Sequence, residues 1–325
     1  MFCECKEIAM RGSLRLLDRV FHCLRGGYYN SNIGGVLLAI PREIYQLYRH
    51  QMMSDEAIIQ WDFKHVFGQR PDLEAPKTFN EKIQWLKLND RTSLHTQCAD
   101  KYAVRDYVSE KVGQEILIPL LYKTEKPEDI RPENLPDPPF IIKTTHGSGF
   151  VKIVRDKASE KWEDLREVLK KQLCVNYYYR SREWQYRDIK PKIIVELLIE
   201  AERNVVPIDY KIYCFHGKPE FILVMTARYV ETRECFYSTD WRSLDFCRTN
   251  PLINSPMQRP KNLEKMLEIA SILSSDFYFA RIDLYHEHGQ IYFGEITHHP
   301  AGGLGKFDPP EWDRKLGDML ILPLK

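Results

Sequence analysis

The stretch "RIDLYHEHGQIYFGEITHHPAGG", residues 281–303, is the most informative part of the sequence. Two apolar runs, "FARIDLY" and "QIYFGEI", flank the short segment "HEHG". Apolar runs of this length around a glycine-containing connection are typical of a β-hairpin. The second run then continues into a carboxylate, two histidines, a proline and a glycine loop, so the hairpin predicts a site as well as a fold.

The predicted hairpin sets two acidic side chains beside each other. A turn centred on Gly289 places Asp283 opposite Glu295 and Arg281 opposite Thr297. All four side chains then share one face, because strand residues alternate. Directly opposite residues have Cβ atoms about 4.5–5.5 Å apart, so a proton, a cation or solvent must offset the carboxylate repulsion. Since Mg²⁺ commonly binds one or two carboxylates together with substrate phosphates, the pair predicts a magnesium–nucleotide site. A solvated acidic pair is the alternative.

The two histidines after the hairpin do not predict zinc. His298 and His299 are adjacent, so on a strand they point in opposite directions. No cysteine or histidine nearby in the sequence has the spacing of a structural zinc site.

A second glycine-containing segment, "KTTHGSG" at residues 143–149, lies between two short predicted strands. Glycines let the backbone approach phosphate oxygens, and unpaired N–H groups bind anions. Lys143 can reach the same anion from the end of its strand. The segment matches neither a Walker loop nor a Rossmann fingerprint. Taken alone it predicts a hairpin turn, and taken with the acidic hairpin it predicts half of a nucleotide clamp.

Composition sets broad limits on the protein. The 325 residues carry a net charge of +1, which gives no basic excess for a nucleic-acid partner. The eight cysteines contain no C-x-x-C pair, which indicates reduced thiols and a cytoplasmic protein. No apolar run reaches the roughly 18–20 residues of a spanning helix, and the N-terminus lacks the apolar core of a signal peptide. Residues 14–27 are expected to form a basic amphipathic helix that could touch the membrane surface or pack on its own domain.

The remaining pattern favours an α+β fold. Residues 1 to 95 are expected to be mainly helical, with a helix start at Asn80 and Glu81. Further along the chain, helices are expected at 161–173 and 262–273, and strands at 192–199, 210–215 and 220–226. Hairpins mixed with helices are typical of α+β proteins rather than of repeated parallel βαβ units. The aromatic and basic segment "NYYYRSREWQYRDIKP" could stack on sugar rings or bases, or pack around a lid.

The order of these parts resembles the ATP-grasp superfamily. A lysine strand and glycine loop come first, then "IIVELLIE", then "DYKIYCFHGKP", and last the acidic hairpin. More closely, "TFNEKIQWLKLND", "DKYAVRDYV", "HGSG", "YYYRSREWQY" and "GKFDPPEWDRKLG" are similar to the TupA-like ATP-grasp family of capsular polysaccharide gene clusters. The resemblance covers roughly residues 75–325. It implies two α+β subdomains that clamp ATP, at 96–195 and 196–325, after the helical region 1–95.

The resemblance also implies roles for individual residues. The phosphate-holding group comprises two lysines and a mobile loop: Lys101, Lys143, Gly147, Ser148 and Gly149. The hinge for adenine and the acid for ribose are Glu196, Leu197, Leu198 and Asp209. Arg281 stabilises charge on the transferred phosphoryl group, and Lys143 assists it. The magnesium ligands are Asp283, Glu295 and Thr297, and the substrate side is lined by His298, Gly302 and Gly303. Thr297 replaces the asparagine of many relatives, which puts a second magnesium ion in doubt.

The function that follows is an ATP-dependent carboxylate–amine ligase. ATP and Mg²⁺ are the expected cofactors, and the product is an amide made through an acyl phosphate. A uronic acid or amino acid is the expected carboxylate, in capsular or cell-surface polysaccharide biosynthesis, with a glycan precursor or small molecule as partner. The alternatives are a glycosyltransferase of the same pathway and a non-catalytic nucleotide-binding protein. The oligomeric state and the role of residues 1–75 stay open.

Overall fold

The computed structural model describes residues 49, 52–137, 139–200, 207–226, 233–248 and 257–323. The chain divides into two compact units, Met1–Ile58 and Ile59–Lys325, and every element from α5 onward belongs to the second. The described α-helices are α4 (Asp55–Phe67), α5 (Phe79–Asn89), α6 (Ser93–Ala99), α7 (Val104–Lys111), α8 (Trp162–Leu173), α9 (Tyr178–Ser181), α10 (Leu263–Ser274) and α11 (Glu311–Met319). The short 3₁₀ helices are η1 (Gln114–Ile116), η2 (Pro127–Asp129), η3 (Pro132–Asn134), η4 (Lys157–Ser159), η5 (Trp184–Tyr186) and η6 (Pro300–Gly303).

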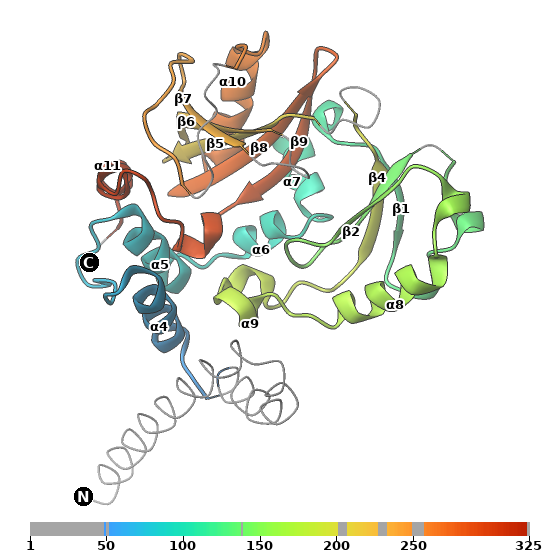
Figure 1. Cartoon of the computed structure of the whole chain (residues 1–325), viewed down its shortest axis with the longest axis horizontal. Helices are drawn as coiled ribbons and strands as arrows, with labels where there is room; N and C mark the ends of the chain where they lie inside the picture. Colours follow the sequence, from blue (N-terminus) through green and yellow to red (C-terminus); the bar gives the residue numbers. More distant parts are fainter. Residues whose placement is uncertain are drawn as a thin grey trace, which may run out of the picture. The chain divides into compact units, whose positions relative to one another are not determined.

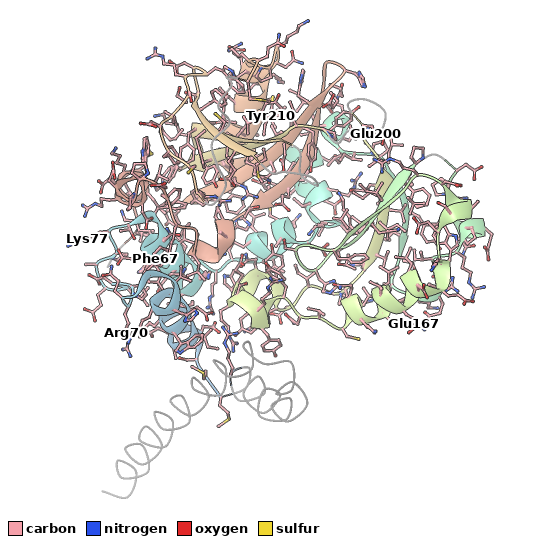
Figure 2. The ribbon with its side chains drawn as sticks, viewed as in Figure 1. Phe67, Arg70, Lys77, Glu167, Glu200 and Tyr210 are labelled. Carbon is pink, nitrogen blue, oxygen red and sulfur yellow. The ribbon has the colours of Figure 1, made fainter. Side chains whose placement is uncertain are left out.

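Two antiparallel sheets organise the second unit (Figure 1). The smaller sheet has the order β1-β4-β2-β3, and its strands are β1 (Leu120–Thr124), β2 (Phe140–Thr144), β3 (Val151–Val154) and β4 (Ile193–Leu197). Helix α8 covers one face of this sheet through Leu165 and Leu169, which pack on Phe140 and Val195. Glu167, labelled in Figure 2, lies on the exposed side of the same helix. We call this part the lid.

The larger sheet has the order β7-β6-β5-β8-β9. Its strands are β5 (Asp209–Phe215), β6 (Lys218–Thr226), β7 (Arg233–Ser238), β8 (Phe279–Glu287) and β9 (Gln290–Thr297). Both predicted hairpins, β5–β6 and β8–β9, are confirmed by the antiparallel pairing. We call this sheet and its helices the core subdomain. The predicted subdomain boundary at residue 196 falls inside β4 of the lid.

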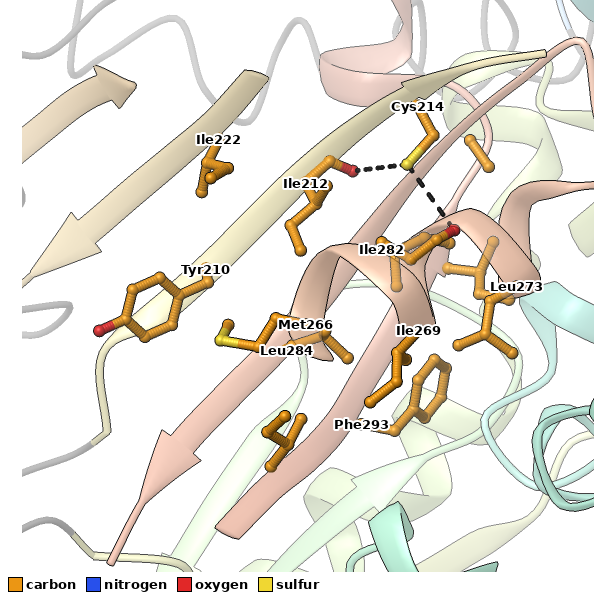
Figure 3. Close-up of a cluster of buried hydrophobic side chains, with 14 of the residues drawn as sticks. Tyr210, Ile212, Cys214, Ile222, Met266, Ile269, Leu273, Ile282, Leu284 and Phe293 are labelled. Atoms are coloured by element: carbon orange, nitrogen blue, oxygen red, sulfur yellow. Dashed lines mark hydrogen bonds between the residues drawn. The ribbon is translucent and has the colours of Figure 1, made fainter. Parts of the chain in front are cut away.

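One face of the larger sheet is apolar and carries α10. Even-numbered residues of β5 and β8, such as Ile212 and Ile282, point to this face and meet Met266, Ile269 and Leu273 of the helix (Figure 3). Burying such side chains stabilises the fold by about 1.5–3 kcal/mol each. Since successive strand residues alternate, the odd-numbered residues of β5 and β8 point to the opposite face. Glu295 and Thr297 of β9, which pair with Asp283 and Arg281, lie on that face too.

The opposite face is divided between packing and charge. Toward β6 and β7 it is aromatic, and Phe221 and Phe236 pack with Phe79 of α5 and Leu316 of α11. Helix α5 begins as predicted, with a capping box in which Thr78 and Glu81 satisfy each other's backbone N–H groups. Toward β5, β8 and β9 the same face carries the charged residues of the candidate site.

The described part of the chain contains no helix long and apolar enough to cross a membrane. The basic amphipathic helix predicted at residues 14–27 lies outside the described residues. Its membrane contact therefore stays a prediction.

Candidate active site

The acidic hairpin has the predicted pairing. Asp283 is opposite Glu295, and Arg281 is opposite Thr297. The turn is not centred on Gly289, however, because Glu287 pairs with Gln290 across a two-residue turn. The predicted pairing at the site is nevertheless correct, because β9 contains one extra residue between the turn and the site.

The extra residue is Gly294, which forms a β-bulge. Asp283 pairs with Glu295 while its neighbour Leu284 pairs with Phe293, so Gly294 has no partner of its own. A Cβ atom at Gly294 would lie 2.9 Å from the Asp283 carbonyl oxygen. Because real Cβ contacts are not this short, only glycine fits the bulge without a shift of the backbone. The bulge therefore sets the register that brings the two carboxylates together.

Asp283 is neutralised by two protein cations. The Arg281 guanidinium donates to both carboxylate oxygens of Asp283, from Nε and Nη2, each at 2.7 Å. Lys211 Nζ lies 2.5 Å from Asp283 Oδ2 and 2.6 Å from Asp209 Oδ2. The side chain of Asp283 is only 2 % exposed. The side chains of Arg281 and Lys211 thus offset the repulsion between the carboxylates. The sequence alone had left a proton, a cation and solvent as alternatives.

Glu295 belongs to the same network but faces outward. Its Oε1 accepts from Arg281 Nη2 at 3.1 Å and from the Thr297 hydroxyl at 3.1 Å, and its side chain is 41 % exposed. Burial of the carboxyl opposes ionisation, but Arg281, Lys211 and Lys101 outweigh it and lower the pKa of Glu295 to about 2. Glu295 is therefore ionised at neutral pH and partly accessible to solvent.

Lys211 was missed by the sequence reasoning, although the signal was present. It lies two residues after Asp209 on β5, so both side chains share a face. The strand pairing then sets Lys211 opposite Asp283. Lys211, Asp283 and Glu295 form a row of one cation and two carboxylates across three adjacent strands.

The lid contributes a second charged group around Glu196. Lys143 Nζ on β2 lies 2.8 Å from Glu196 Oε2 on β4. Arg105 Nη1 of α7 lies 3.1 Å from the other oxygen, Oε1. The sequence predicted that Lys143 and Glu196 belong to the same site, and in the structure the two side chains form an ion pair. It also adds Arg105, which no motif had singled out.

The predicted glycine loop lies between β2 and β3 of the lid. Lys101 Nζ donates a short hydrogen bond to the Gly147 carbonyl. Burial lowers the pKa of Lys101, the nearby Glu295 opposes that shift and Lys143 adds to it. Lys101 is thus close to charges of both subdomains. Gly149 has φ +102°, a conformation that favours glycine, and a Cβ there would meet nothing within 4 Å.

The aromatic segment after α8 packs against this loop, as one of its two interpretations expected. A Cβ at Gly147 would lie 3.4 Å from Tyr177. Burial raises the pKa of the Tyr177 hydroxyl. The rings of Tyr177 and Tyr186 meet edge to face at 5.0 Å. These tyrosines therefore support the loop from the lid side.

The hinge residues after Glu196 are engaged through their backbone. The N–H of Leu197 donates to the Pro119 carbonyl at 3.0 Å, and that of Leu198 to the Pro139 carbonyl at 3.2 Å. An adenine ring at this hinge would have to bind other backbone atoms than these two N–H groups.

The predicted substrate residues follow β9 directly. His298 is 3 % exposed, and its ring packs between His95 and Phe277 at 4.5 and 4.7 Å. Its position is that of a buried packing residue. Gly302 and Gly303 have φ +63° and +67°, and their carbonyls accept from Gln84 Nε2 of α5 at 3.0 and 2.6 Å. Helix α5 therefore fixes the glycine loop beside the acidic hairpin.

The donor set suits magnesium held together with phosphate. Within the described residues no group of three His, Cys, Asp or Glu side chains is arranged to hold a metal ion. Asp283 and Glu295 supply two carboxylates, and Thr297 adds one hydroxyl. A Mg²⁺ ion needs six oxygen ligands and usually takes several from phosphates and water, so these residues fit a nucleotide-bound ion better than an isolated one.

Comparison with solved structures finds ATP-grasp ligases. A D-alanine–D-alanine ligase from Bacillus anthracis, complexed with ATP, is 18% identical with a TM-score of 0.41, over 69% of this chain and 64% of that chain. The Helicobacter pylori enzyme is 14% identical with a TM-score of 0.42, over 77% and 68%. The ligase PsnB, complexed with a precursor variant, Mg and ADP, is 12% identical with a TM-score of 0.41, over 76% and 66%. The match thus spans less than two thirds of the Bacillus anthracis ligase.

No protein with a curated description matches the sequence. The family model described as TupA-like ATP-grasp matches residues 81–321. That span contains both sheets, the glycine loop and the acidic hairpin. The protein therefore belongs to the TupA-like ATP-grasp family.

Proposed function

We propose that the protein is an ATP-dependent carboxylate–amine ligase that forms an amide through an acyl phosphate. The observation that carries the proposal is a group of four cations from the lid and the core subdomain. They are Lys101, Lys143, Lys211 and Arg281, and they lie around the carboxylates Asp209, Glu196, Asp283 and Glu295. Lys211 and Arg281 contact Asp283 directly, and Lys101 lies close to Glu295 and Lys143. Such a set of charges is suited to the phosphates of ATP.

The chemistry needs no nucleophilic side chain. An oxygen of the substrate carboxylate attacks the γ-phosphorus of ATP, the bond to the β–γ bridging oxygen breaks, and ADP leaves. The amine nitrogen then attacks the acyl carbon, the bond to the phosphate oxygen breaks, and the amine loses a proton. In this proposal Arg281 stabilises charge on the transferred group, and Lys101 and Lys143 hold the phosphates.

Magnesium, when bound, would neutralise phosphate charge and orient the transferred group. Asp283 and Glu295 would hold it, with Thr297 beside them. We further propose that the carboxylate belongs to a uronic acid or an amino acid and that the product serves capsular or cell-surface polysaccharide biosynthesis. The family membership supports this pathway, and the substrate pair has to be found by experiment.

The test is ATP turnover by the purified chain. ADP and phosphate release would be measured with Mg-ATP against panels of uronic acids, amino acids and amines. Release that requires both an acid and an amine, with a matching amide found by mass spectrometry, is the expected result. Tight binding of Mg-ATP without turnover across the panels would favour the non-catalytic alternative. Hydrolysis of a sugar nucleotide without ATP would favour the glycosyltransferase.

A further inference from the structure

A buried group of three charges lies at the end of β4, outside the acidic hairpin. Glu196 is between two cations, with Lys143 on one carboxylate oxygen at 2.8 Å and Arg105 on the other at 3.1 Å. The side chains of Glu196, Arg105 and Lys143 are 8 %, 17 % and 18 % exposed. The Glu196 carboxylate therefore binds two cations at a position with little access to water.

The two cations come from different subdomains. Lys143 lies on β2, beside Glu196 in the lid sheet, where Glu196 pairs with Ile141. Arg105 lies on α7, whose Val104 and Val108 belong to the apolar cluster of the core subdomain. The hydroxyl of Tyr107, on the same helix, donates to the Leu273 carbonyl of α10 at 3.0 Å. Arg105 thus reaches from the core subdomain to the lid.

When Lys143 binds a phosphate, it divides its charge and its three N–H donors between the phosphate and Glu196, so its contact with Glu196 weakens. A buried carboxylate that loses one of two counter-ions still has a partner, whereas one that loses its only counter-ion is left with an unpaired buried charge. With Arg105 present, Glu196 remains paired while the Lys143 ammonium moves. Without Arg105, Lys143 would be the only cation on Glu196 and would be held there.

We propose that Arg105 is a positioning residue that releases Lys143 for the nucleotide by remaining as the counter-ion of Glu196. The inference rests on the proposed binding of ATP at this site. It acts through Glu196 and does not require Arg105 to touch the nucleotide. Its signature is energetic coupling: the effect of removing Arg105 on ATP affinity must depend on the presence of Lys143.

The experiment measures the Kd of Mg-ATP by calorimetry for four proteins: the wild type, Arg105→Gln, Lys143→Met and the double variant. We expect Arg105→Gln to weaken binding about tenfold in the wild-type background, as a coupling of ordinary size would. In the Lys143→Met background the same change should alter Kd less than about twofold. Arg105→Lys, which keeps the charge, should bind within about threefold of the wild type.

The matched control is Lys111→Gln on the same helix. Lys111 pairs with Asp276 at 2.8 Å, so it makes an ion pair of α7 that does not reach the lid. It should leave the Kd unchanged. Arg105→Met, which retains the packing of the alkyl stem, replaces Arg105→Gln if that variant does not fold.

Two outcomes overturn the inference while leaving the proposed function in place. One is unchanged ATP affinity on loss of Arg105, and the other is an equal loss with and without Lys143. A wild-type protein that does not bind Mg-ATP would overturn the proposed function itself, and the inference with it.

Discussion

At the scale of single residues, burial separates the two site carboxylates. Asp283 is 2 % exposed and Glu295 is 41 % exposed. Asp283→Asn leaves Arg281 and Lys211 buried without full counter-charge, so we expect it to lower the free energy of unfolding by about 3–5 kcal/mol. Glu295→Gln makes the same charge change at a hydrated position and should cost at most about 1 kcal/mol.

Urea unfolding of the two variants, followed by circular dichroism, measures this difference. Glu295→Gln serves as the matched control, since it lies directly opposite Asp283. Equal losses of stability would contradict the assignment of Arg281 and Lys211 to Asp283.

A second residue, His146, should make the stability of the fold depend on pH. It is 4 % exposed, and burial lowers its pKa below the usual 6.5 although its Nε2 donates to the Gln172 carbonyl. A histidine with a lowered folded-state pKa stabilises the fold fully above pH 6.5, and that stability is lost as the pH falls below 6.5. His146→Gln should therefore reduce the slope of stability against pH in acid, by at most about 1.4 kcal/mol per pH unit.

Urea unfolding of the wild type and of His146→Gln at several values between pH 5 and pH 8 measures both slopes. Coincident slopes below pH 6.5 would show that His146 is protonated equally in the folded and unfolded chains.

Residue placement was predictable where it depended on alternation along a strand. The shared face of Arg281 and Asp283 followed from that rule, and the position of Lys211 beside Asp209 would have followed from it too. Arg105 could not be found this way. Its partner is 91 positions along the chain, and only the packing of α7 on the core subdomain brings the two together.

At the scale of elements, the β8–β9 hairpin depends on its bulge. Gly294→Ala places a Cβ 2.9 Å from the Asp283 carbonyl oxygen, so the backbone must shift or the bulge must move. We expect a loss of about 1–3 kcal/mol in unfolding free energy. We also expect a loss of Mg-ATP binding, because Glu295 leaves its place opposite Asp283.

Gly289→Ala is the control for this prediction. Gly289 has φ +80° but open space around its Cβ position, so alanine there strains the turn and leaves the site unchanged. Both variants should lose stability, and only Gly294→Ala should lose Mg-ATP binding in calorimetry. A Gly294→Ala protein that binds Mg-ATP as the wild type does would show that the bulge does not set the site.

The sequence predicted the hairpin but not this irregularity. Apolar runs around "HEHG" indicate two paired strands, and the turn residues His288 and Gly289 both have positive φ, at 51° and 80°, as tight hairpins require. The bulge left no pattern of its own, since a glycine inside a strand also occurs for other reasons. The predicted pairing at the site was right because the displaced turn and the bulge compensate.

At the scale of the whole molecule, Mg-ATP should join the lid to the core subdomain. Ligand at about 100 times its Kd raises the free energy of unfolding by about 2.7 kcal/mol. We expect the melting temperature to rise with Mg-ATP and to rise less with ATP and excess chelator. Thermal melts of the wild type and Glu295→Gln test this, and an equal rise in both proteins would place the nucleotide elsewhere.

The overall architecture was predictable because several ordered motifs had to fit one fold. The strand, glycine loop, hinge and acidic hairpin each had common alternatives, and only their order distinguished them. Subdomain boundaries were harder to predict, since β4 joins the lid while its final residues lead into the core subdomain. The carboxylate and the amine stay proposals, because two of the three predicted substrate residues, Gly302 and Gly303, have no side chain that would indicate a substrate class.

The contacts of Arg281 and Lys211 with the acidic pair have a consequence for ion selectivity. Both side chains must release the oxygens of Asp283 before a cation can bind to Asp283 as well as to the exposed Glu295. A nucleotide triphosphate offers them new acceptors in exchange, whereas a free divalent ion offers none and is repelled by the charges it displaces. The site should therefore bind magnesium at cellular concentrations only together with a nucleotide, so that the metal alone does not occupy it.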